Sequence, residues 1–377
     1  AASDVYKRQP PALETIALHA DHLNSDDGGA ESVAPTLSFS TTFRQPHPDS
    51  ELAKRAHDMT ENPDKPSAHV YSRYTQDTRQ RTESVISAVI GAHSLLYASG
   101  LSAAYAAIQL YCPSAVAIRG GYFGVHEGLR VYCKNRDVKI VDLDDDYPVS
   151  EGARDKDCPE LVTGTTLVWV ETPLNPTGEA RDLAHYVKRA HDAKGVVVVD
   201  STFAPPPLQD PFQFNVDLVM HSGTKYFGGH SDLLMGILST RSYSIYKHLW
   251  LERAVTGTVP GSMETYLLLR SLRTMALRVR QQSATATRLA KFLYSLTAGK
   301  SSDFMAPPEI ANGKFILHVW HSSLQPRERS EFDTMENTNF DPSKQMTGGH
   351  SPTFGVMVSD ELIARYLPHN LSYFVVR

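Results

Sequence analysis

Seven short apolar runs recur between residues 94 and 240, and most of them are separated by segments of helical length. The runs are SLLYAS (94–99), AVAIRG (115–120), KIVDL (139–143), LVWVE (167–171), VVVVD (196–200), DLVMHS (217–222) and MGILST (235–240). Continuous rather than alternating apolar strands are typical of a sheet that is covered on both faces. Because strands and helices alternate along the chain, the sequence predicts an α/β fold with a mostly parallel sheet.

The segments that flank this alternating region differ from it in composition. Residues 1–65 are rich in Pro, Ser, Asp and His, which predicts an extended N-terminal arm with little core of its own. Residues 66–255 contain the alternating pattern and predict one large domain. Residues 256–377 begin with long amphipathic helical segments and continue with two strand candidates and a short helix, which predicts a smaller α+β domain. The chain ends within the strand-like run LSYFVVR, so we expect this domain to be incomplete.

Composition indicates which kinds of binding partner and which compartment to expect. Lys and Arg total 37 and Asp and Glu total 42, for a net charge of −5, so nothing predicts binding to nucleic acid or to an anionic membrane. No apolar run approaches the ~18 residues of a membrane-spanning helix. The three cysteines, Cys112, Cys133 and Cys158, are odd in number and far apart. They match neither a disulfide framework nor a zinc site, which favours a reducing compartment such as the cytoplasm.

Polar residues follow the apolar runs at the points where the strands are expected to end. In open parallel sheets, ligands bind beyond the carboxyl ends of the strands. Asp200 ends four consecutive valines, and Lys225 follows the run DLVMHS within a turn rich in small residues. Separately, the aspartate is explained by a helix cap and the lysine by a solvated turn. Together they suggest a Schiff-base lysine and a partner for a pyridinium, the arrangement that holds pyridoxal phosphate.

The sequence also contains candidate residues for binding a phosphate. Ser99 and Gly100 precede a helical segment, and the free backbone N–H groups of a helix start favour an anion, although the same pattern is common in plain capping. Further candidates are the hydroxyls of Ser222 and Thr224, which flank the lysine, and the pair Tyr71 and Arg73, which could equally be a surface pair.

Two loop residues complete the candidate site. Tyr122 lies among glycines, which would let its ring lie flat on a planar ligand, or it covers core. Asn175 lies within LNP and could offer its amide to a ring hydroxyl, but Asn-Pro is also a common turn signal.

Six ordered motifs resemble one known family. The segments YSR, SGL, GGYFG, ETPLNP, VVDSTF and DLVMHSGTKYFGGHSD look like those of the Cys/Met-metabolism pyridoxal-phosphate enzymes, which include cystathionine γ-synthase, γ-lyase and β-lyase. The resemblance covers roughly residues 13 to 300. It implies the pyridoxal-phosphate-dependent transferase fold, with a large domain like that of aspartate aminotransferase, and pyridoxal 5′-phosphate as cofactor. It also implies action on amino acids such as cystathionine or O-acylhomoserine.

The resemblance assigns roles to individual residues. Lys225 would carry the cofactor as an aldimine and shuttle protons, and Asp200 would pair with the pyridine nitrogen. Tyr122, the second expected catalytic residue, would stack on the ring, and Asn175 would contact its 3′-oxygen. The remaining expected contacts are to the phosphate: Gly100, Leu101, Ser222 and Thr224 from the same chain, and Tyr71 and Arg73 from a neighbouring subunit. A homodimer or homotetramer is therefore implied.

This sequence departs from the family pattern in places. The tyrosine motif continues here as Phe123-Gly124-Val125 instead of Gly-Gly-Thr, and Gln76-Asp77 stand where Asn-Pro usually follows YSR. The family's Ser-Leu-Gly segment and its substrate-carboxylate arginine are expected after the last residues printed.

The sequence leaves the reaction open between elimination at Cβ or Cγ, which a lyase performs, and replacement at Cγ, which a cystathionine γ-synthase or sulfhydrylase performs. An aminotransferase and a non-catalytic cofactor-binding protein are further alternatives. We expect no metal site: His221 and His230 lack a metal spacing, and DLDDDYP (142–148) is better explained as an acidic surface loop.

Overall fold

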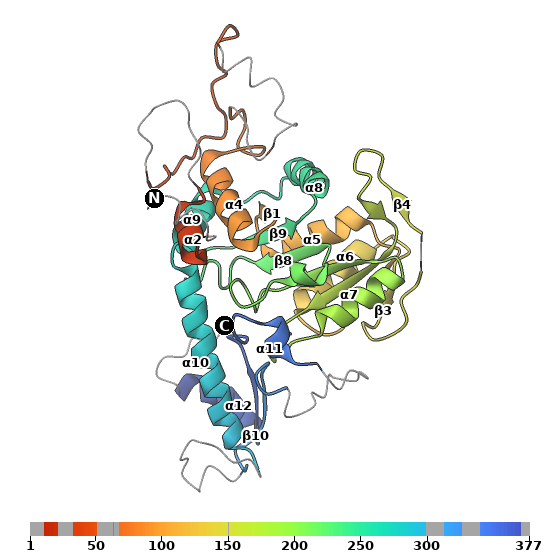
Figure 1. Ribbon diagram of the computed structural model, residues 1–377, viewed down its shortest axis with the longest axis vertical. Helices are drawn as coiled ribbons and strands as arrows, with labels where there is room; N and C mark the ends of the chain where they lie inside the picture. Colours follow the sequence, from red (N-terminus) through yellow and green to blue (C-terminus); the bar gives the residue numbers. More distant parts are fainter. Residues whose placement is uncertain are drawn as a thin grey trace, which may run out of the picture.

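The computed structural model describes residues 11–21, 33–50, 63, 68–149, 151–298, 313–325 and 340–370. Its centre is a seven-stranded sheet in the order β1-β9-β8-β7-β6-β2-β3 (Figure 1). The strands are β1 (His93–Tyr97), β2 (Ala115–Ala117), β3 (Lys139–Val141), β6 (Thr166–Glu171), β7 (Val196–Asp200), β8 (Leu218–Ser222) and β9 (Gly236–Thr240). Each of the seven apolar runs thus contributes one strand, as the sequence predicts.

The sheet is parallel from β8 to β3, and β9 alone runs in the opposite direction to its neighbours. Parallel neighbours need a crossover connection, whereas a turn can join only antiparallel strands. Turns connect β8 to β9, without an intervening helix, so β9 returns antiparallel along β8. The prediction of a mostly parallel sheet is confirmed.

Helices cover both faces of the sheet, which explains the continuous apolar strands. The core on one face includes α5 (Gly100–Tyr111), α6 (Phe123–Cys133) and α8 (Tyr243–Thr256), and a second core includes α7 (Leu183–Asp192) and the 3-10 helix η1 (Pro211–Phe214). All six residues of β6 are buried. Strands with both faces buried lose the alternation of polar and apolar residues. Two further short strands, β4 (Ala153–Arg154) and β5 (Val162–Thr163), pair outside the main sheet.

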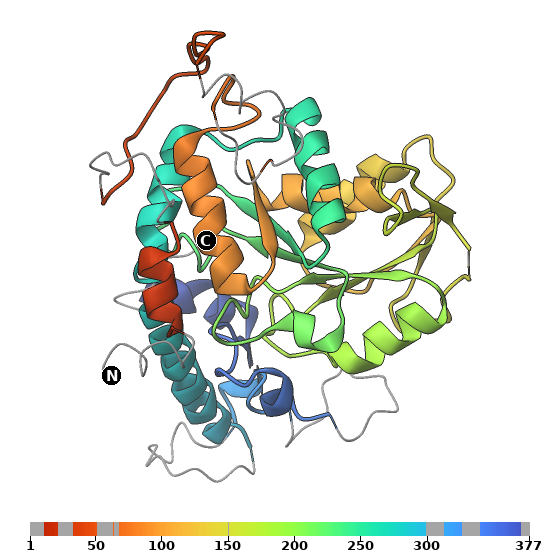
Figure 2. The ribbon, with the colours of Figure 1, turned by 45° about the horizontal axis from the view of Figure 1, so that its top comes forward.

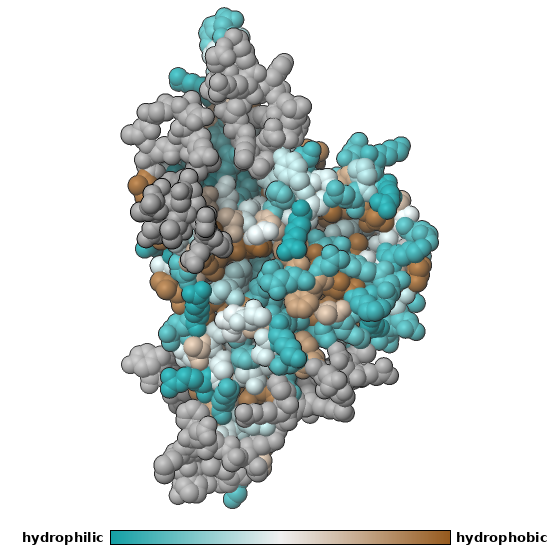
Figure 3. All heavy atoms as spheres, viewed as in Figure 1, coloured by the Kyte–Doolittle hydropathy of each residue, from teal (hydrophilic) through white to brown (hydrophobic). Residues whose placement is uncertain are grey.

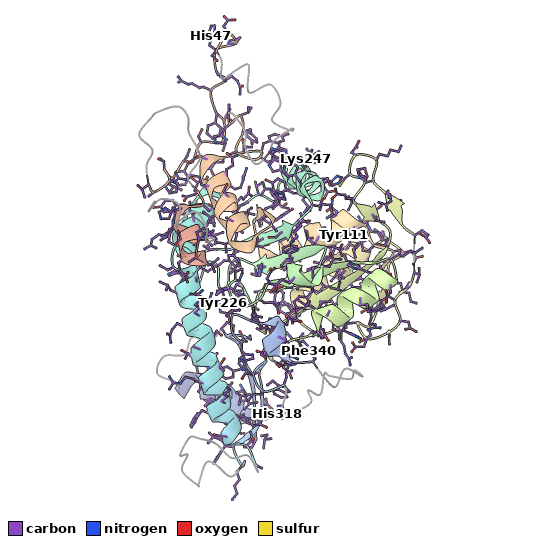
Figure 4. All side chains as sticks on the ribbon, viewed as in Figure 1. His47, Tyr111, Tyr226, Lys247, His318 and Phe340 are labelled. Atoms are coloured by element: carbon purple, nitrogen blue, oxygen red, sulfur yellow. The ribbon has the colours of Figure 1, made fainter. Side chains whose placement is uncertain are left out.

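A third core joins the N-terminal segment to the helices that follow the sheet. It includes α4 (Asp77–Ile90), α9 (Ser262–Leu272) and α10 (Met275–Ser295), together with Ala17 of α2 (Leu13–His19). The sequence does not predict α2 within the arm of residues 1–65. Its buried Ala17 and the ion pairs of Asp21 with Arg81 and Arg273 attach this part of the arm to the helices. Residues 33–50 extend away from the sheet, with His47 at the far end (Figure 4).

The long helix α10 leads from the sheet to a second, smaller group of elements (Figures 1 and 2). There β10 (Ile316–Trp320) pairs antiparallel with β11 (Gly355–Val358) beside α10, followed by α12 (Glu361–Asn370). The short α11 (Pro342–Gln345) lies closer to the sheet, where the Gln345 side chain accepts a hydrogen bond from the Leu183 backbone N–H. Both strand candidates and the helix predicted for this region are present. The boundary at residue 256 stays a prediction; α9, beyond it, packs against α4.

The surface is mixed in polarity. On the face drawn in Figure 3, apolar residues form separate patches among hydrophilic ones. None of the described helices is long and apolar enough to cross a membrane.

Candidate functional site

A cavity of about 440 Å³ opens at the carboxyl ends of the central strands. Glu171, Asp200 and Ser222 are the last residues of β6, β7 and β8, and all three line it. The other lining residues are Ser99, Gly100, Leu101, Tyr122, Val125, Pro173, Asn175, Thr202, Phe203, Met220, Thr224, Lys225 and Leu234. Eight of the ten predicted site residues are therefore brought together here, although they come from segments between residues 100 and 225.

Lys225 lies in the tight turn that follows β8. Its backbone N–H donates to the Ser222 carbonyl at 3.1 Å, and its own carbonyl accepts from the Gly229 N–H at 2.6 Å. These bonds fix the backbone of the turn, whereas the Lys225 ammonium makes no hydrogen bond or ion pair with any described residue. The turn thus presents to the cavity an amine that has no partner in the part of the chain that the structure describes.

Asp200 is buried at the end of β7 and is held by Thr202. Its Oδ1 accepts from the Thr202 backbone N–H at 3.0 Å and from the Thr202 hydroxyl at 2.5 Å. Burial raises the pKa of Asp200 to about 6, while the two bonds from Thr202 favour the ionised form. The ionised carboxylate that these two bonds favour can pair with a cationic group in the cavity.

An anion-binding element lies in the same cavity. Ser99 caps α5 by accepting from the Ser102 backbone N–H at 3.1 Å, and the following residues of the first turn have N–H groups without helical partners. A β-carbon at Gly100 would come within 3.0 Å of the Ser222 hydroxyl oxygen. Glycine at this position thus lets the helix start approach Ser222 closely, and both can face one anion.

Thr224 is less free to bind a ligand than the sequence predicts. Its hydroxyl oxygen accepts from the Met235 backbone N–H at 2.9 Å, so the side chain also attaches the lysine turn to the chain before β9. The hydroxyl lines the cavity and keeps a second lone pair.

Tyr122 and Asn175 line the cavity from two different loops. Tyr122 precedes α6, is 38% exposed and packs edge-on against Phe123 with ring centroids 5.0 Å apart. Asn175 lies in the loop after β6. The backbone N–H of each donates to the same side chain, that of Glu171, at 2.7 Å.

Glu171 is a cavity residue to which the sequence analysis assigned no role. It pairs with Asp200 in the ladder between β6 and β7, and only 6% of its surface is exposed. Burial, with the negative charge of Asp200 as a second cause, raises the pKa of Glu171 to about 8. The signal available in the sequence was its position, since Glu171 ends LVWVE as Asp200 ends VVVVD. Thr202, two residues after Asp200, also lines the cavity, and the sequence analysis assigned it no role either.

Tyr71 and Arg73 are not part of this cavity. Tyr71 forms an isolated bridge with Thr42, and the Arg73 guanidinium donates to the Ala254 carbonyl. The same guanidinium lies 5.4 Å from the ring centroid of Tyr71 and 4.8 Å from that of Tyr74. Their predicted role in a neighbouring subunit stays a prediction.

The acidic loop of residues 142–148 has partners of its own. Arg119 forms ion pairs with Asp142 and Asp144, and the Tyr186 hydroxyl donates to Asp144 at 2.8 Å. In the part of the chain that the structure describes, no three His, Cys, Asp or Glu side chains are grouped as metal ligands.

The donor groups of the cavity fit pyridoxal 5′-phosphate. Asp200 would be a buried acceptor for the ring nitrogen, and Lys225, which has no partner among the described residues, would be the amine for the aldehyde. Gly100 and Ser222 would form an element for the phosphate. Lys225 and Asp200 do not form an ion pair with each other, so a structural ion pair does not explain why both line the cavity.

Comparison with known proteins identifies the family of this chain. Residues 14–306 match the family model of the Cys/Met metabolism PLP-dependent enzymes. Cystathionine gamma-lyase of Saccharomyces cerevisiae is 32% identical over 288 residues, which are 74% of this chain and 66% of that protein. Cystathionine beta-lyase of Lactococcus lactis is 28% identical over 82% of this chain and 74% of its own length.

Solved structures agree as well. The crystal structure of the cystathione gamma lyase from Micromonospora echinospora superimposes with a TM-score of 0.71 and 26% identity, covering 98% of this chain and 84% of that one. The match with the yeast enzyme spans 66% of its length, so this chain corresponds to about two thirds of that relative. The chain belongs to the Cys/Met metabolism PLP-dependent enzyme family, and its cofactor is pyridoxal 5′-phosphate.

Proposed function

We propose that this protein cleaves the C–S bond of cystathionine-like amino acids by β- or γ-elimination, as a trans-sulfuration enzyme of cysteine and methionine metabolism. The supporting relatives bear the names cystathionine gamma-lyase and cystathionine beta-lyase. The observation that carries the proposal is the cavity that contains both Lys225, with no partner among the described residues, and the buried carboxyl group of Asp200.

Different residues of the cavity would have different roles in such a reaction. When bound, the cofactor supplies an electron sink for the pair released at the substrate Cα. Asp200 would keep a proton on the ring nitrogen, because its ionised carboxylate favours a cation beside it. The Lys225 amine would take the Cα proton and return protons at the carbons where bonds break. The apolar side chains of the cavity, such as Val125, Phe203 and Leu234, would exclude water from the reacting carbons.

Product analysis of the full chain, saturated with pyridoxal 5′-phosphate, tests the proposal. Cystathionine should yield pyruvate if the enzyme cleaves at Cβ and 2-oxobutanoate if it cleaves at Cγ. O-acylhomoserine with cysteine should yield cystathionine only if the enzyme performs γ-replacement. The Lys225→Ala variant is the control and should release neither keto acid.

Two results would overturn the proposal. Lasting loss of the ~420 nm absorbance after an amino acid is added would indicate transamination instead. Cofactor binding without any keto acid or thiol would indicate a non-catalytic binding protein.

We further propose that the protein acts as a homodimer or homotetramer in which Tyr71 and Arg73 complete the cofactor site of the neighbouring subunit. Both lie outside the cavity of their own chain, although Arg73 is a phosphate-type ligand. Mixing the Lys225→Ala and Arg73→Ala variants tests this arrangement. Subunit exchange should restore up to about a quarter of the activity, because a mixed dimer has one intact site. No recovery despite demonstrated exchange would contradict shared sites.

We also propose a reducing compartment, the cytoplasm, as the place of action. The thiols of Cys112, Cys133 and Cys158 are free, and Cys112 is exposed. An exposed free thiol is compatible with a reducing environment. Fractionation of the source cells, with the protein detected by antibody, would test it, and a secreted protein would contradict it.

A further inference from the structure

Glu171 has an unusual setting for a carboxylate. It ends β6, directly beside Asp200 in the sheet ladder, and only 6% of its surface is exposed. The neighbouring charged groups are Asp200, which repels a second negative charge, and Arg181, which attracts it. Burying an acid next to another acid is costly unless its oxygens are bonded. Such a cost at the wall of a cavity points to a task at that cavity.

The two oxygens of Glu171 hold two loops. Oε2 accepts from the Tyr122 backbone N–H and Oε1 from the Asn175 backbone N–H, each at 2.7 Å. One loop connects β2 to α6, and the other follows β6. Tyr122 and Asn175 are the two loop residues whose side chains are expected to contact the cofactor ring. One carboxylate therefore sets the position of two ring contacts that are distant in sequence.

The first loop is built closely around this carboxylate. Gly121 has φ +84°, and a β-carbon there would overlap Glu171 Oε2. Both facts require glycine, because an L side chain is strained at this φ and would also displace the acid. The backbone at Gly121 thus approaches Glu171 closely enough for the next residue, Tyr122, to donate its N–H.

We propose that Glu171 is a positioning residue for the cofactor, which holds Tyr122 and Asn175 against the ring of pyridoxal 5′-phosphate through their backbone N–H groups. This inference rests on the proposed site but not on which C–S bond is cleaved. A role through the acid itself, by its proton or its charge beside Asp200, is the competing explanation. Two substitutions distinguish these explanations. Glu171→Gln keeps the length of the side chain, and Glu171→Asp keeps its carboxyl group.

The test measures binding of pyridoxal 5′-phosphate to the apoprotein by fluorescence titration. Glu171→Gln keeps the length and one acceptor oxygen, so it should keep one loop in place and weaken binding about tenfold. Glu171→Asp keeps the acid but, one methylene shorter, withdraws from both N–H groups and should weaken binding further. The absorbance maximum of the bound cofactor should shift in the same order, because the ring contacts move.

Asp217→Asn is the matched control. Asp217 also accepts a backbone N–H, that of Val197 at 2.7 Å, but at the opposite end of the strands. This variant should bind the cofactor as the wild type does. Circular dichroism and melting temperature establish that each variant is folded before it is titrated.

The possible results are distinct. If Glu171→Asp binds better than Glu171→Gln, charge and not positioning is the role of Glu171. If both variants match the wild type, the inference is wrong even though the site stands. If the wild type itself does not bind pyridoxal 5′-phosphate, the proposed site fails first.

A double-mutant cycle removes the remaining ambiguity. If Glu171 acts through the Asn175 loop, the loss of affinity caused by Glu171→Asp should be smaller in an Asn175→Ala background than in the wild type. Fully additive losses would contradict coupling through that loop. The same cycle with Tyr122→Ala tests the other loop.

Discussion

The ends of β6 and β7 differ in what their carboxylates do, although the two are register partners. Among the described residues, Asp200 accepts hydrogen bonds from its close neighbour Thr202, both at Oδ1. Glu171 uses both oxygens on the backbone of two loops. The same position in the strand and similar burial therefore do not determine the role of either acid. We expect the hydrogen-bond partners to decide which acid binds a ligand and which supports the loops around it.

The largest expected effect follows from removing the ligand-binding member of the pair. Asp200→Ala would leave the cationic ring nitrogen without a buried partner, a loss of about 3–5 kcal/mol or roughly 10² to several thousand-fold in catalytic efficiency. The measurement is kcat/KM of the cofactor-saturated variant against wild type. A loss smaller than that of Glu171→Gln would reverse the roles assigned to the two acids.

A second experiment uses pH to separate the two acids. The pKa of Glu171 is about 8 in the folded chain against 4.5 for an unperturbed glutamate. The folded state thus binds the proton more tightly, and the resulting stability is fully present below pH 4.5 and lost as pH rises through 8. The free energy of unfolding of the apoprotein should therefore fall between about pH 6 and pH 8 as this group ionises.

Urea unfolding of the apoprotein at these two pH values measures that slope. The glutamine in Glu171→Gln cannot titrate, so the stability of this variant should change less with pH than that of the wild type over the same range. An equal slope in both proteins would show that another group is responsible and that Glu171 is ionised in the folded state.

The smallest expected effect concerns the support of Asp200. The Thr202 hydroxyl donates to Asp200 and accepts from the Ser222 backbone N–H at 2.8 Å. Thr202→Val removes both bonds at nearly constant volume and should destabilise the apoprotein by about 1–3 kcal/mol, while Thr202→Ser keeps the hydroxyl and serves as control. Cofactor affinity should fall in the valine variant only. If serine and valine behave alike, the methyl group and not the hydroxyl is what matters at this position.

Much of the fold could be predicted from sequence because its signals are local. The seven apolar runs are strands. Burial on both faces makes each strand continuously apolar, and this pattern can be read from the strand's own residues. The reversal of β9 and the helix α2 were not predicted. Strand direction depends on the connection, and α2 is held by the distant Arg81 and Arg273 through Asp21.

The positions of Lys225 and Asp200 in the cavity could be predicted from sequence, because Asp200 ends one apolar run and Lys225 lies in the turn after another. Sequence by itself thus indicated the cofactor, pyridoxal 5′-phosphate. Tertiary structure decided the rest. It placed Glu171 between the loops of Tyr122 and Asn175, moved the Thr224 hydroxyl onto the Met235 backbone, and left Arg73 outside its own cavity. The physical reason is that a side chain's role depends on which backbone groups lie within about 3 Å of it, and residues far apart in sequence supply those groups.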